Sequence, residues 1–320
     1  MENKRYLVVT HGVDIDGMGP IVLARAAFGA GKVDAYFVNN VPETSNAVMK
    51  ALSKIDEYER VFVTDVCPSF DTLNTIDGNE EYKTKVRIFD HHKYVLTDTL
   101  GGKPNPFGFL KIEERGCNGP TCGTELFYDF LLNHGKLKRT ELLDELVENT
   151  RQYDTWDWKK TNNETAWGLN VLFGKLGKLG YIENLTKKVE FNGELLSFQE
   201  KIMIEKEKQR IANACDELIA SMHFEQVGGH IIGVIDNGSD EFKNDVSEII
   251  RQKGGLGIDA VAMLISARNS ISMRTIAKGF DCTKFAAAYG GGGHAAAAGL
   301  PVSNETLNVF NIKVNEKQGQ

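Results

Sequence analysis

Carboxylate and imidazole side chains follow short β-branched runs, or end a helical run, at four places in the first half of this sequence. They are His11, Asp14 and Asp16, then Asp65, then Asp90, His91 and His92, and finally Asp154. Side chains at the carboxyl ends of parallel strands converge at one edge of a sheet, where open α/β folds bind ligands. Mixed oxygen and nitrogen donors suit Mn²⁺ or a related divalent cation. The four segments together predict a dinuclear metal site.

Each segment also has a simpler interpretation when it is taken alone. Asp16 precedes a glycine, and Asp-Gly is a common turn pair. Asp65 could merely cap the helix expected from Pro68, and the triplet from Asp90 to His92 could open a polar loop. The triplet favours a metal more strongly, because an acid and two imidazoles are costly to bury without partners.

Two divalent cations at such a site could lower the pKa of water and neutralise charge on a phosphodiester during in-line attack. Far downstream, Gly290 to Gly293 precede His294 and a run of four alanines. Glycine amides can approach an anion without obstruction by a Cβ, and the alanine run could begin a helix whose N-terminus favours phosphate. A flexible linker is the alternative. His92, Arg274 and the loop amides could stabilise developing negative charge, with Arg268 as the alternative to Arg274.

The elements that position these residues alternate between strand and helix patterns, which predicts a parallel sheet with helices on both faces. Strands are expected over residues 6–10, 33–38, 60–66 and 85–90. Helices are expected near residues 18–30 and 44–55 and over residues 121–133 and 139–153, and a further helix is expected to begin at residue 68. Glycines and prolines predict a long loop over 101–120.

The second half predicts a smaller α/β domain. Residues 193–222 read as a connecting helix, followed by strands over 224–227 and 230–235, a helix around 245–252 and paired strands over 258–265 and 270–276. We therefore expect a catalytic domain over residues 1–192, a helical linker over 193–223 and a substrate-binding domain over 224–320.

Charge and composition limit the classes of function. The net charge of the 320 residues is −7, which argues against binding of long duplex nucleic acid. No run approaches the ~18 apolar residues of a membrane span, so the expected location is the cytoplasm. Five cysteines without a C-x-x-C pair indicate reduced thiols. Trp156, Trp158 and Trp167 are expected in the core rather than stacked on a base, because aromatic residues beside a helix end are more often core.

All of these motifs, in this order, resemble the DHH phosphoesterase superfamily in the branch whose second domain is of the DHHA1 type. The resemblance spans nearly the whole chain and is strongest to the short-oligonucleotide phosphodiesterases called nanoRNases. Other relatives hydrolyse 3′-phosphoadenosine 5′-phosphate or cyclic nucleotides. The resemblance therefore implies a parallel-sheet DHH domain joined by a helical linker to a smaller α/β DHHA1 domain.

The resemblance also implies roles for individual residues. His11 and Asp14 would bind one metal, Asp16, His91 and Asp154 the other, and Asp65 would bridge both, with His92 close to the scissile phosphate. Asp157 lies near enough to Asp154 to compete for its role. Asp65, His91 and His92 are the expected catalytic residues, and the expected substrate-binding residues are Arg274, Gly291, Gly292, Gly293 and His294.

The expected activity is two-metal hydrolysis of short oligonucleotides or small dinucleotides to mononucleotides, with two Mn²⁺ ions and with Mg²⁺ or Co²⁺ as alternatives. A 3′-phosphoadenosine 5′-phosphate phosphatase and a cyclic (di)nucleotide phosphodiesterase are the alternative enzymes. A nucleotide sensor without catalysis is the alternative of another class. The expected partner is a short single-stranded oligonucleotide or small nucleotide, with a homodimer as the candidate assembly.

Overall fold

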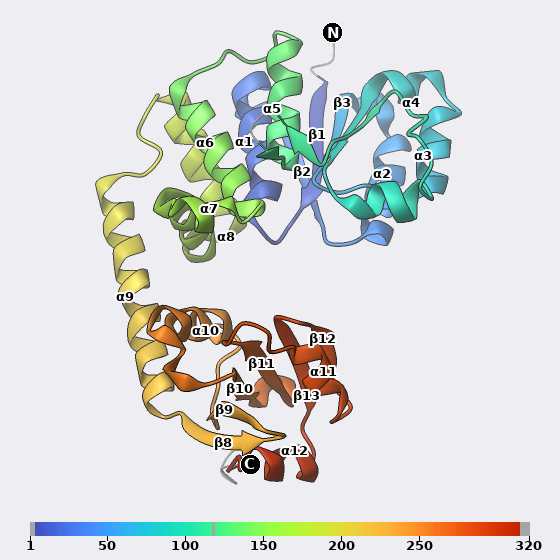
Figure 1. The fold of residues 1–320 in the computed structure, drawn as a ribbon. Helices are drawn as coiled ribbons and strands as arrows, with labels where there is room; N and C mark the ends of the chain where they lie inside the picture. Colours follow the sequence, from blue (N-terminus) through green and yellow to red (C-terminus); the bar gives the residue numbers. More distant parts are fainter. Residues whose placement is uncertain (1–3, 117–118, 314–320) are drawn as a thin grey trace, which may run out of the picture. The chain divides into compact units, whose positions relative to one another are not determined.

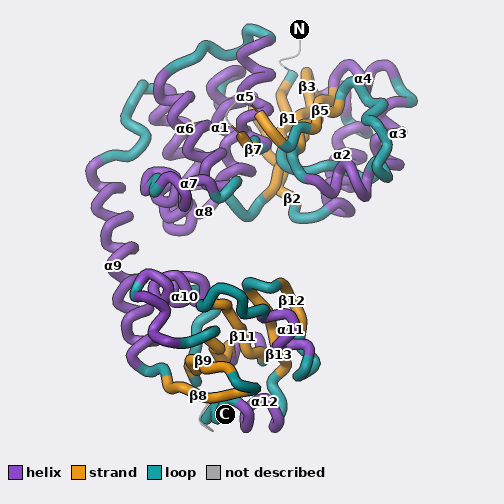
Figure 2. The backbone as a smooth tube through the Cα atoms, in the orientation of Figure 1, coloured by secondary structure: helices purple, strands orange, loops and turns teal. Residues whose placement is uncertain are grey.

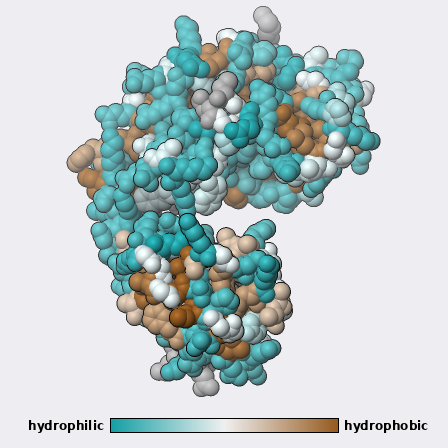
Figure 3. All heavy atoms as spheres, viewed as in Figure 1, coloured by the Kyte–Doolittle hydropathy of each residue, from teal (hydrophilic) through white to brown (hydrophobic). Residues whose placement is uncertain are grey.

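The computed structural model describes residues 4–116 and 119–313, which form two compact units that divide between residues 204 and 205 (Figure 1). The dividing point lies inside helix α9 (Phe198–Ala220), within the segment predicted to link two domains. Among the described helices, none has the length and apolar character that crossing a membrane requires. On the face drawn in Figure 3, hydrophilic side chains cover most of both units.

The first unit alternates strands and helices, as the sequence pattern predicts (Figure 2). Its elements before α9 are β1 (Arg5–His11), α1 (Ile15–Phe28), β2 (Val33–Val38), α2 (Val41–Leu52), β3 (Tyr58–Thr64), α3 (Phe70–Asp77), α4 (Glu80–Lys85), β4 (Val86–Asp90), β5 (Leu110–Ile112), β6 (Arg115–Gly116), β7 (Gly119–Pro120), α5 (Gly123–Asn133), α6 (Glu141–Asp154), α7 (Asp157–Thr161) and α8 (Glu164–Glu190). Short turns of other helix types occupy Ala30–Lys32, Ile55–Glu57 and Val95–Thr99.

The main sheet of this unit has the order β2-β1-β3-β4-β5, and all of its strands run parallel. Alternating side chains along β1 divide the core, because Val8 packs with α1, α5, α6 and α8 while Val9 packs with α2 and α3. These helices cover opposite faces of the sheet in Figure 1. The carboxyl ends of β1, β3 and β4 therefore lie next to one another at one edge of the sheet.

Two features of the first unit differ from the sequence-based expectation. The segment 101–120 is not only a loop, because Leu110–Ile112 pair with β4 as the fifth parallel strand. Sheet pairing prevails there over the local glycine and proline signal. The long helix α8 was not predicted, and three glycines in its middle explain why. Its backbone leaves the helical conformation at Gly177, where φ is 67°.

The second unit contains a mixed six-stranded sheet with the order β12-β13-β11-β10-β9-β8, in which only β9 and β10 pair in parallel. Its elements are β8 (His223–Val227), β9 (His230–Ile235), α10 (Lys243–Gln252), β10 (Ala260–Ile265), β11 (Ser270–Thr275), α11 (Cys282–Ala287), β12 (Gly292–His294), β13 (Ala297–Pro301) and α12 (Asn304–Val309), with 3₁₀ turns at Gly254–Gly257 and Ser266–Arg268. The predicted pair of strands before the glycine loop is confirmed as β10 and β11.

The prediction that alanines after the glycine loop begin a helix is wrong. The loop continues into β12, and Ala297 and Ala298 lie in β13, opposite Arg274 and Met273 of β11. Pairing on both sides of β13 prevails over the helix propensity of alanine, which is only a weak local preference. The loop amides therefore belong to a strand edge and not to a helix N-terminus.

Four of the five cysteines, Cys67, Cys122, Cys215 and Cys282, are buried free thiols. The fifth, Cys117, lies outside the described residues.

Candidate metal centre

The first group of candidate ligands lies where β1 passes into α1. Asp14 caps α1, because its Oδ1 accepts a hydrogen bond from the Gly17 N–H at 3.1 Å. The other oxygen of Asp14 lies 3.1 Å from His11 Nδ1. The turn interpretation of the Asp16-Gly17 pair is therefore wrong, because both residues lie in α1. The capping carboxylate of Asp14 also faces an imidazole.

Asp16 lies in the first turn of α1 and is fully buried. Its two carboxylate oxygens accept backbone N–H groups of Gly123 and Thr124 at 2.7 and 2.8 Å. The Thr124 hydroxyl also donates to the Asp16 carbonyl at 2.8 Å. The beginning of α5 thus fixes this carboxylate in place, a contact that the sequence did not predict.

Asp65 directly follows β3 and is only 2% exposed. Its φ of 60° places it in the left-handed region, and its N–H donates to the Phe89 carbonyl at 2.9 Å. Asp65 does not cap the next helix, because Ser69 accepts the Thr72 N–H at the start of α3. Its carboxylate instead points toward histidines from two other strands.

The triplet Asp90, His91 and His92 lies at the end of β4, and each member has a different environment. Asp90 is fully buried and accepts the His92 N–H at 2.9 Å, with His92 Nδ1 at 2.8 Å. His91 Nε2 lies 3.2 Å from Asp65 Oδ1. Asp90 therefore orients His92, while His91 faces the other carboxylates.

Asp154 is the last residue of α6, and its Oδ2 lies 3.6 Å from His91 Nε2. The preceding turn is anchored by Arg151, which donates to Glu148, to the Pro120 carbonyl at 3.0 Å and to Asp157 at 3.2 Å. Asp157 also pairs with Lys160 at 2.7 Å. Of the two acids that could complete the centre, only Asp154 faces it.

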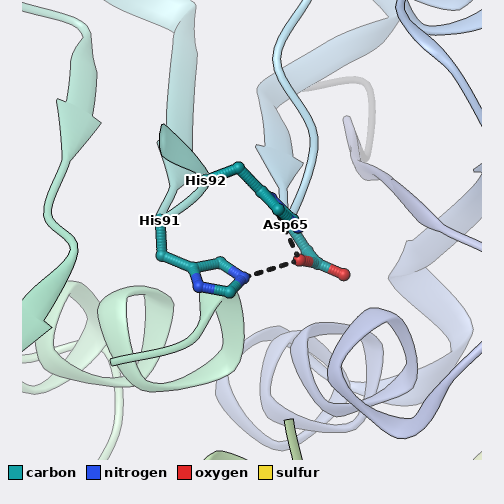
Figure 4. Close-up of side chains that lie close together, drawn as sticks. All are labelled: Asp65, His91 and His92. Carbon is teal, nitrogen blue, oxygen red and sulfur yellow. Dashed lines mark hydrogen bonds and ion pairs between the residues drawn. The ribbon is translucent and has the colours of Figure 1, made fainter. Parts of the chain in front are cut away.

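Three overlapping groups of potential ligands result, and within each group the donor atoms lie within 4.8 Å of one another. The groups are His11, Asp14 and Asp65, then Asp16, His91 and Asp154, then Asp65, His91 and His92. Figure 4 shows His91 and His92 directed toward the shared Asp65 carboxylate. The mixture of carboxylate and imidazole donors fits divalent cations such as Mn²⁺, Mg²⁺ or Zn²⁺.

Burial and neighbouring charges shift the pKa values of several members of this cluster. Burial raises the pKa of Asp65 well above its usual range, and the negative charge of Asp16 adds to this effect. The same two causes, in the same order, raise the pKa of Asp154 to about 8. Hydrogen bonds to Asp14 and then Asp65 raise the pKa of His11 to about 10. Burial alone would raise the pKa of Asp14, but the contacts with His11 and the Gly17 N–H lower it. Cations would replace protons on these side chains, because ligands bind metal in their deprotonated form.

We expect the metal-free protein to lose stability as the pH rises from about 6.5 to 9. Because the pKa of His11 is higher in the folded state than in the unfolded chain, its proton stabilises the folded state fully below the ordinary histidine pKa. This stabilisation is lost as the pH rises toward the folded-state pKa of about 10. Asp154 acts in the same direction, because the folded state keeps its proton up to a pKa of about 8, whereas the unfolded chain releases it near 4. Thermal melting in EDTA across this range measures the effect, and saturating Mn²⁺ should flatten it. A melting temperature in EDTA that rises with pH would contradict this assignment.

Comparison with known proteins agrees with the geometry, although no protein-family model matches the chain. The sequence is 28% identical over 310 residues to the oligoribonuclease NrnB of Bacillus subtilis strain 168, covering 95% of this chain and 75% of that protein. The fold is similar to that of the pGpG-specific phosphodiesterase PggH from Vibrio cholerae, with a TM-score of 0.53, 15% identity and 95% of each chain covered. Exonuclease RecJ bound to manganese aligns with a TM-score of 0.47 and 16% identity over 97% of this chain and 89% of that one.

These likenesses agree with the resemblance to the DHH phosphoesterase superfamily that the sequence motifs carry. The α/β fold class predicted from the sequence is confirmed, with its parallel five-stranded sheet and a second sheet domain. The ligand roles of individual residues are predictions that substitution can test.

Asp154 and Asp157 provide one test of these roles. Asp154→Asn should lower metal-dependent turnover by about 10²-fold or more, because it removes a charged ligand from the Asp16 and His91 group. Asp157→Asn should leave turnover within a few-fold of wild type, because Asp157 pairs with Arg151 and Lys160. Steady-state kinetics of the two variants under the same Mn²⁺ titration measure the difference. The opposite ranking would assign the ligand role to Asp157.

The predicted substrate-binding residues belong to the second unit, where a hollow of about 250 Å³ opens beside β11. Arg274, Gly292 and Gly293 line it together with Arg268 and Lys243. Gly291 and His294 do not line it. A Cβ at Gly291 would meet the Gly299 carbonyl at 2.3 Å, so this glycine serves close packing of the loop.

The two candidate arginines of this hollow differ in their partners. Arg268 pairs with Asp240 at 2.6 Å. Arg274 donates to Asn244, Ser272 and the Met273 carbonyl, each at 2.9 Å, and no described carboxylate lies within salt-bridge distance of it. Of the two arginines, Arg274 is therefore the one without a salt-bridge partner among the described residues.

Proposed function

We propose that this protein is a phosphoesterase that uses two divalent cations, with Mn²⁺ preferred, to hydrolyse short oligonucleotides or small dinucleotides to mononucleotides. One observation carries the proposal, namely the orientation of Asp65. Its Oδ2 lies 3.6 Å from His11 Nδ1, and its Oδ1 lies 3.2 Å from His91 Nε2. A carboxylate whose two oxygens face two different ligand groups is suited to bridge two cations.

The relatives support the substrate class. NrnB is named an oligoribonuclease, and PggH is named a pGpG-specific phosphodiesterase. Both names describe the cleavage of nucleotide phosphodiesters. The overall charge of −7 also fits a small substrate that is held by local groups rather than by a general basic surface.

His11, Asp14, Asp16, Asp65, His91 and Asp154 would hold the cations, which supply Lewis acidity toward phosphate oxygens and water. His92 has a separate task. Its Nδ1 is held by Asp90, which leaves Nε2 for substrate. Burial would lower the pKa of His92, but the hydrogen bond to Asp90 raises it above the ordinary histidine value. The raised pKa favours the protonated ring, which could stabilise the charge of a phosphate group.

We further propose that the hollow beside β11 binds an anionic group of the substrate through Arg274. Arg274→Ala should raise KM by about 10-fold or more with a smaller change in kcat, because a charged hydrogen bond to the substrate is lost. Arg268→Ala should change KM less, since Asp240 already neutralises Arg268. Kinetics of both variants on the same dinucleotide compare them. Equal effects would argue against Arg274 as the principal contact.

The test of the function is the release of mononucleotides from RNA of two to five residues in Mn²⁺, with 3′-phosphoadenosine 5′-phosphate in a parallel reaction. Preferred cleavage of the RNA is the expected outcome. Phosphate release from 3′-phosphoadenosine 5′-phosphate without RNA cleavage would instead assign a nucleotide phosphatase. Binding of nucleotides without any turnover in Mn²⁺ would indicate a sensor and reject both enzymatic alternatives.

A further inference from the structure

Trp156, two residues beyond Asp154, has an unusual backbone conformation. Its φ is 61° and its ψ is 12°, which places it in the left-handed region. Four of the seven described non-glycine residues with positive φ are asparagines, and only Trp156 and Leu256 among the seven have large apolar side chains. Asparagine tolerates this conformation, whereas a bulky L-residue is strained in it. Local preference therefore does not explain a tryptophan at this position.

Burial does not explain it either. Trp156 is 58% exposed, so the expectation that it lies in the core is wrong. The neighbouring Trp158 differs, because its ring stacks on Tyr153 with centroids 5.9 Å apart and planes inclined by 14°. Strained and exposed residues tend to occur at functional sites, where the surrounding structure maintains them.

Lys159 adds a positive charge to this exposed ring. Its ammonium lies 4.8 Å from the centre of the Trp156 ring and 5.4 Å from that of Trp158. No carboxylate in the described part of the chain lies within salt-bridge distance of Lys159, whereas the adjacent Lys160 pairs with Asp157 at 2.7 Å. An exposed aromatic ring beside an unneutralised lysine is the combination that binds single-stranded nucleotides by stacking and charge.

The position relative to the metal centre follows from the chain itself. Two peptide units separate Trp156 from Asp154, so their Cα atoms are at most about 7 Å apart. The Asp154 carboxylate lies 3.6 Å from His91 in the candidate metal centre. The Trp156 side chain therefore starts close enough to the candidate metal centre to reach the base of a nucleotide whose phosphate is bound at that centre.

We propose that Trp156 is a stacking surface for a nucleobase of the substrate, and that Lys159 attracts the phosphate backbone next to that base. This inference rests on the proposed function, because it requires a nucleotide at the metal centre. It assigns base recognition to the first unit, where the expectations from the sequence were metal ligands and a phosphate contact from His92.

Two variants separate this role from a structural one. Trp156→Asn removes the ring and introduces the residue type that the left-handed conformation favours, so we expect the melting temperature to rise by about 2 to 4 °C. The same variant should raise KM for the dinucleotide pApA by about 5- to 150-fold, the loss expected for one stacked base. Trp156→Phe should retain most of the affinity. Lys159→Gln should raise KM less, and Lys160→Gln is the matched control with unchanged KM.

An analogue of pApA that lacks one base distinguishes stacking from a general disturbance of the site. If Trp156 stacks on that base, Trp156→Asn should affect the analogue little. An unchanged KM for pApA, an equal loss on the analogue, or a fall in both stability and turnover would each overturn the inference.

Fluorescence tests the inference independently of turnover. The chain has three tryptophans, so Trp158→Phe combined with Trp167→Phe leaves Trp156 as the only one. In Mn²⁺, AMP should quench this fluorescence and ribose 5-phosphate should not. Quenching by AMP without any cleavage of pApA would reject the proposed function and keep the stacking site. Cleavage of pApA without quenching by AMP would reject the stacking site alone.

Discussion

Asp65→Asn should abolish metal-dependent hydrolysis, with a loss of at least about 10³-fold, while the protein stays folded. The loss follows because a bridging carboxylate contributes to both cation sites, and several kcal/mol of transition-state charge stabilisation depend on those cations. Steady-state hydrolysis of pApA over a Mn²⁺ titration measures it. Asp129→Asn is a matched control, since Asp129 lies on α5 and belongs to none of the three ligand groups.

The same variant should be at least as stable as wild type in EDTA. Asparagine is isosteric with aspartate and tolerates the φ of 60° at this position. It also removes an acid whose pKa is raised well above the usual range by burial and by Asp16. Wild type should gain thermal stability on addition of Mn²⁺, and the variant should gain much less. Full turnover in Asp65→Asn, or an unchanged stabilisation by Mn²⁺, would reject a bridging role for this carboxylate.

Much of the arrangement around Asp65 could be predicted from the sequence, for a physical reason. Short β-branched runs alternating with helices imply parallel strands, and parallel strands place their carboxyl ends at one edge. An acid or imidazole directly after each run must then lie near the others. The structure brings His11, Asp65 and His91 together from β1, β3 and β4 in this way.

The contacts that orient these ligands could not be predicted, because they depend on tertiary packing. Nothing in the local sequence indicates that the beginning of α5 donates to Asp16 across more than 100 residues. Similarly, the alanine run after the glycine loop becomes β13 only because β11 and β12 lie on either side of it. Trp156 was assigned to the core because a pattern of residue types does not reveal a left-handed turn after α6.

Gly123→Ala should lower kcat/KM by about 10²-fold, the effect expected when ligands are displaced by about 1 Å. Gly123 is the first residue of α5, and its N–H donates to Asp16 Oδ2 at 2.7 Å. A Cβ at this position would lie 2.8 Å from the backbone nitrogen and the Cβ of Asp65. Such a contact is too short, so the methyl group would push α5, and the Asp16 carboxylate bound to it, away from Asp65.

The effect on stability should be smaller than the effect on catalysis. Overpacking of this kind destabilises by about 1 to 3 kcal/mol, which leaves a protein of ordinary stability folded at low temperature. Gly108→Ala is the matched control, because no atom lies within 4 Å of the Cβ that it adds and its φ is not positive. Kinetics and Mn²⁺ titration at a temperature where both variants are folded should show weaker metal binding only for Gly123→Ala. Unchanged turnover and metal affinity in Gly123→Ala would mean that Asp16 and Asp65 adjust their positions independently. The close packing of α5 against the end of β3 would then have no part in holding the metal centre.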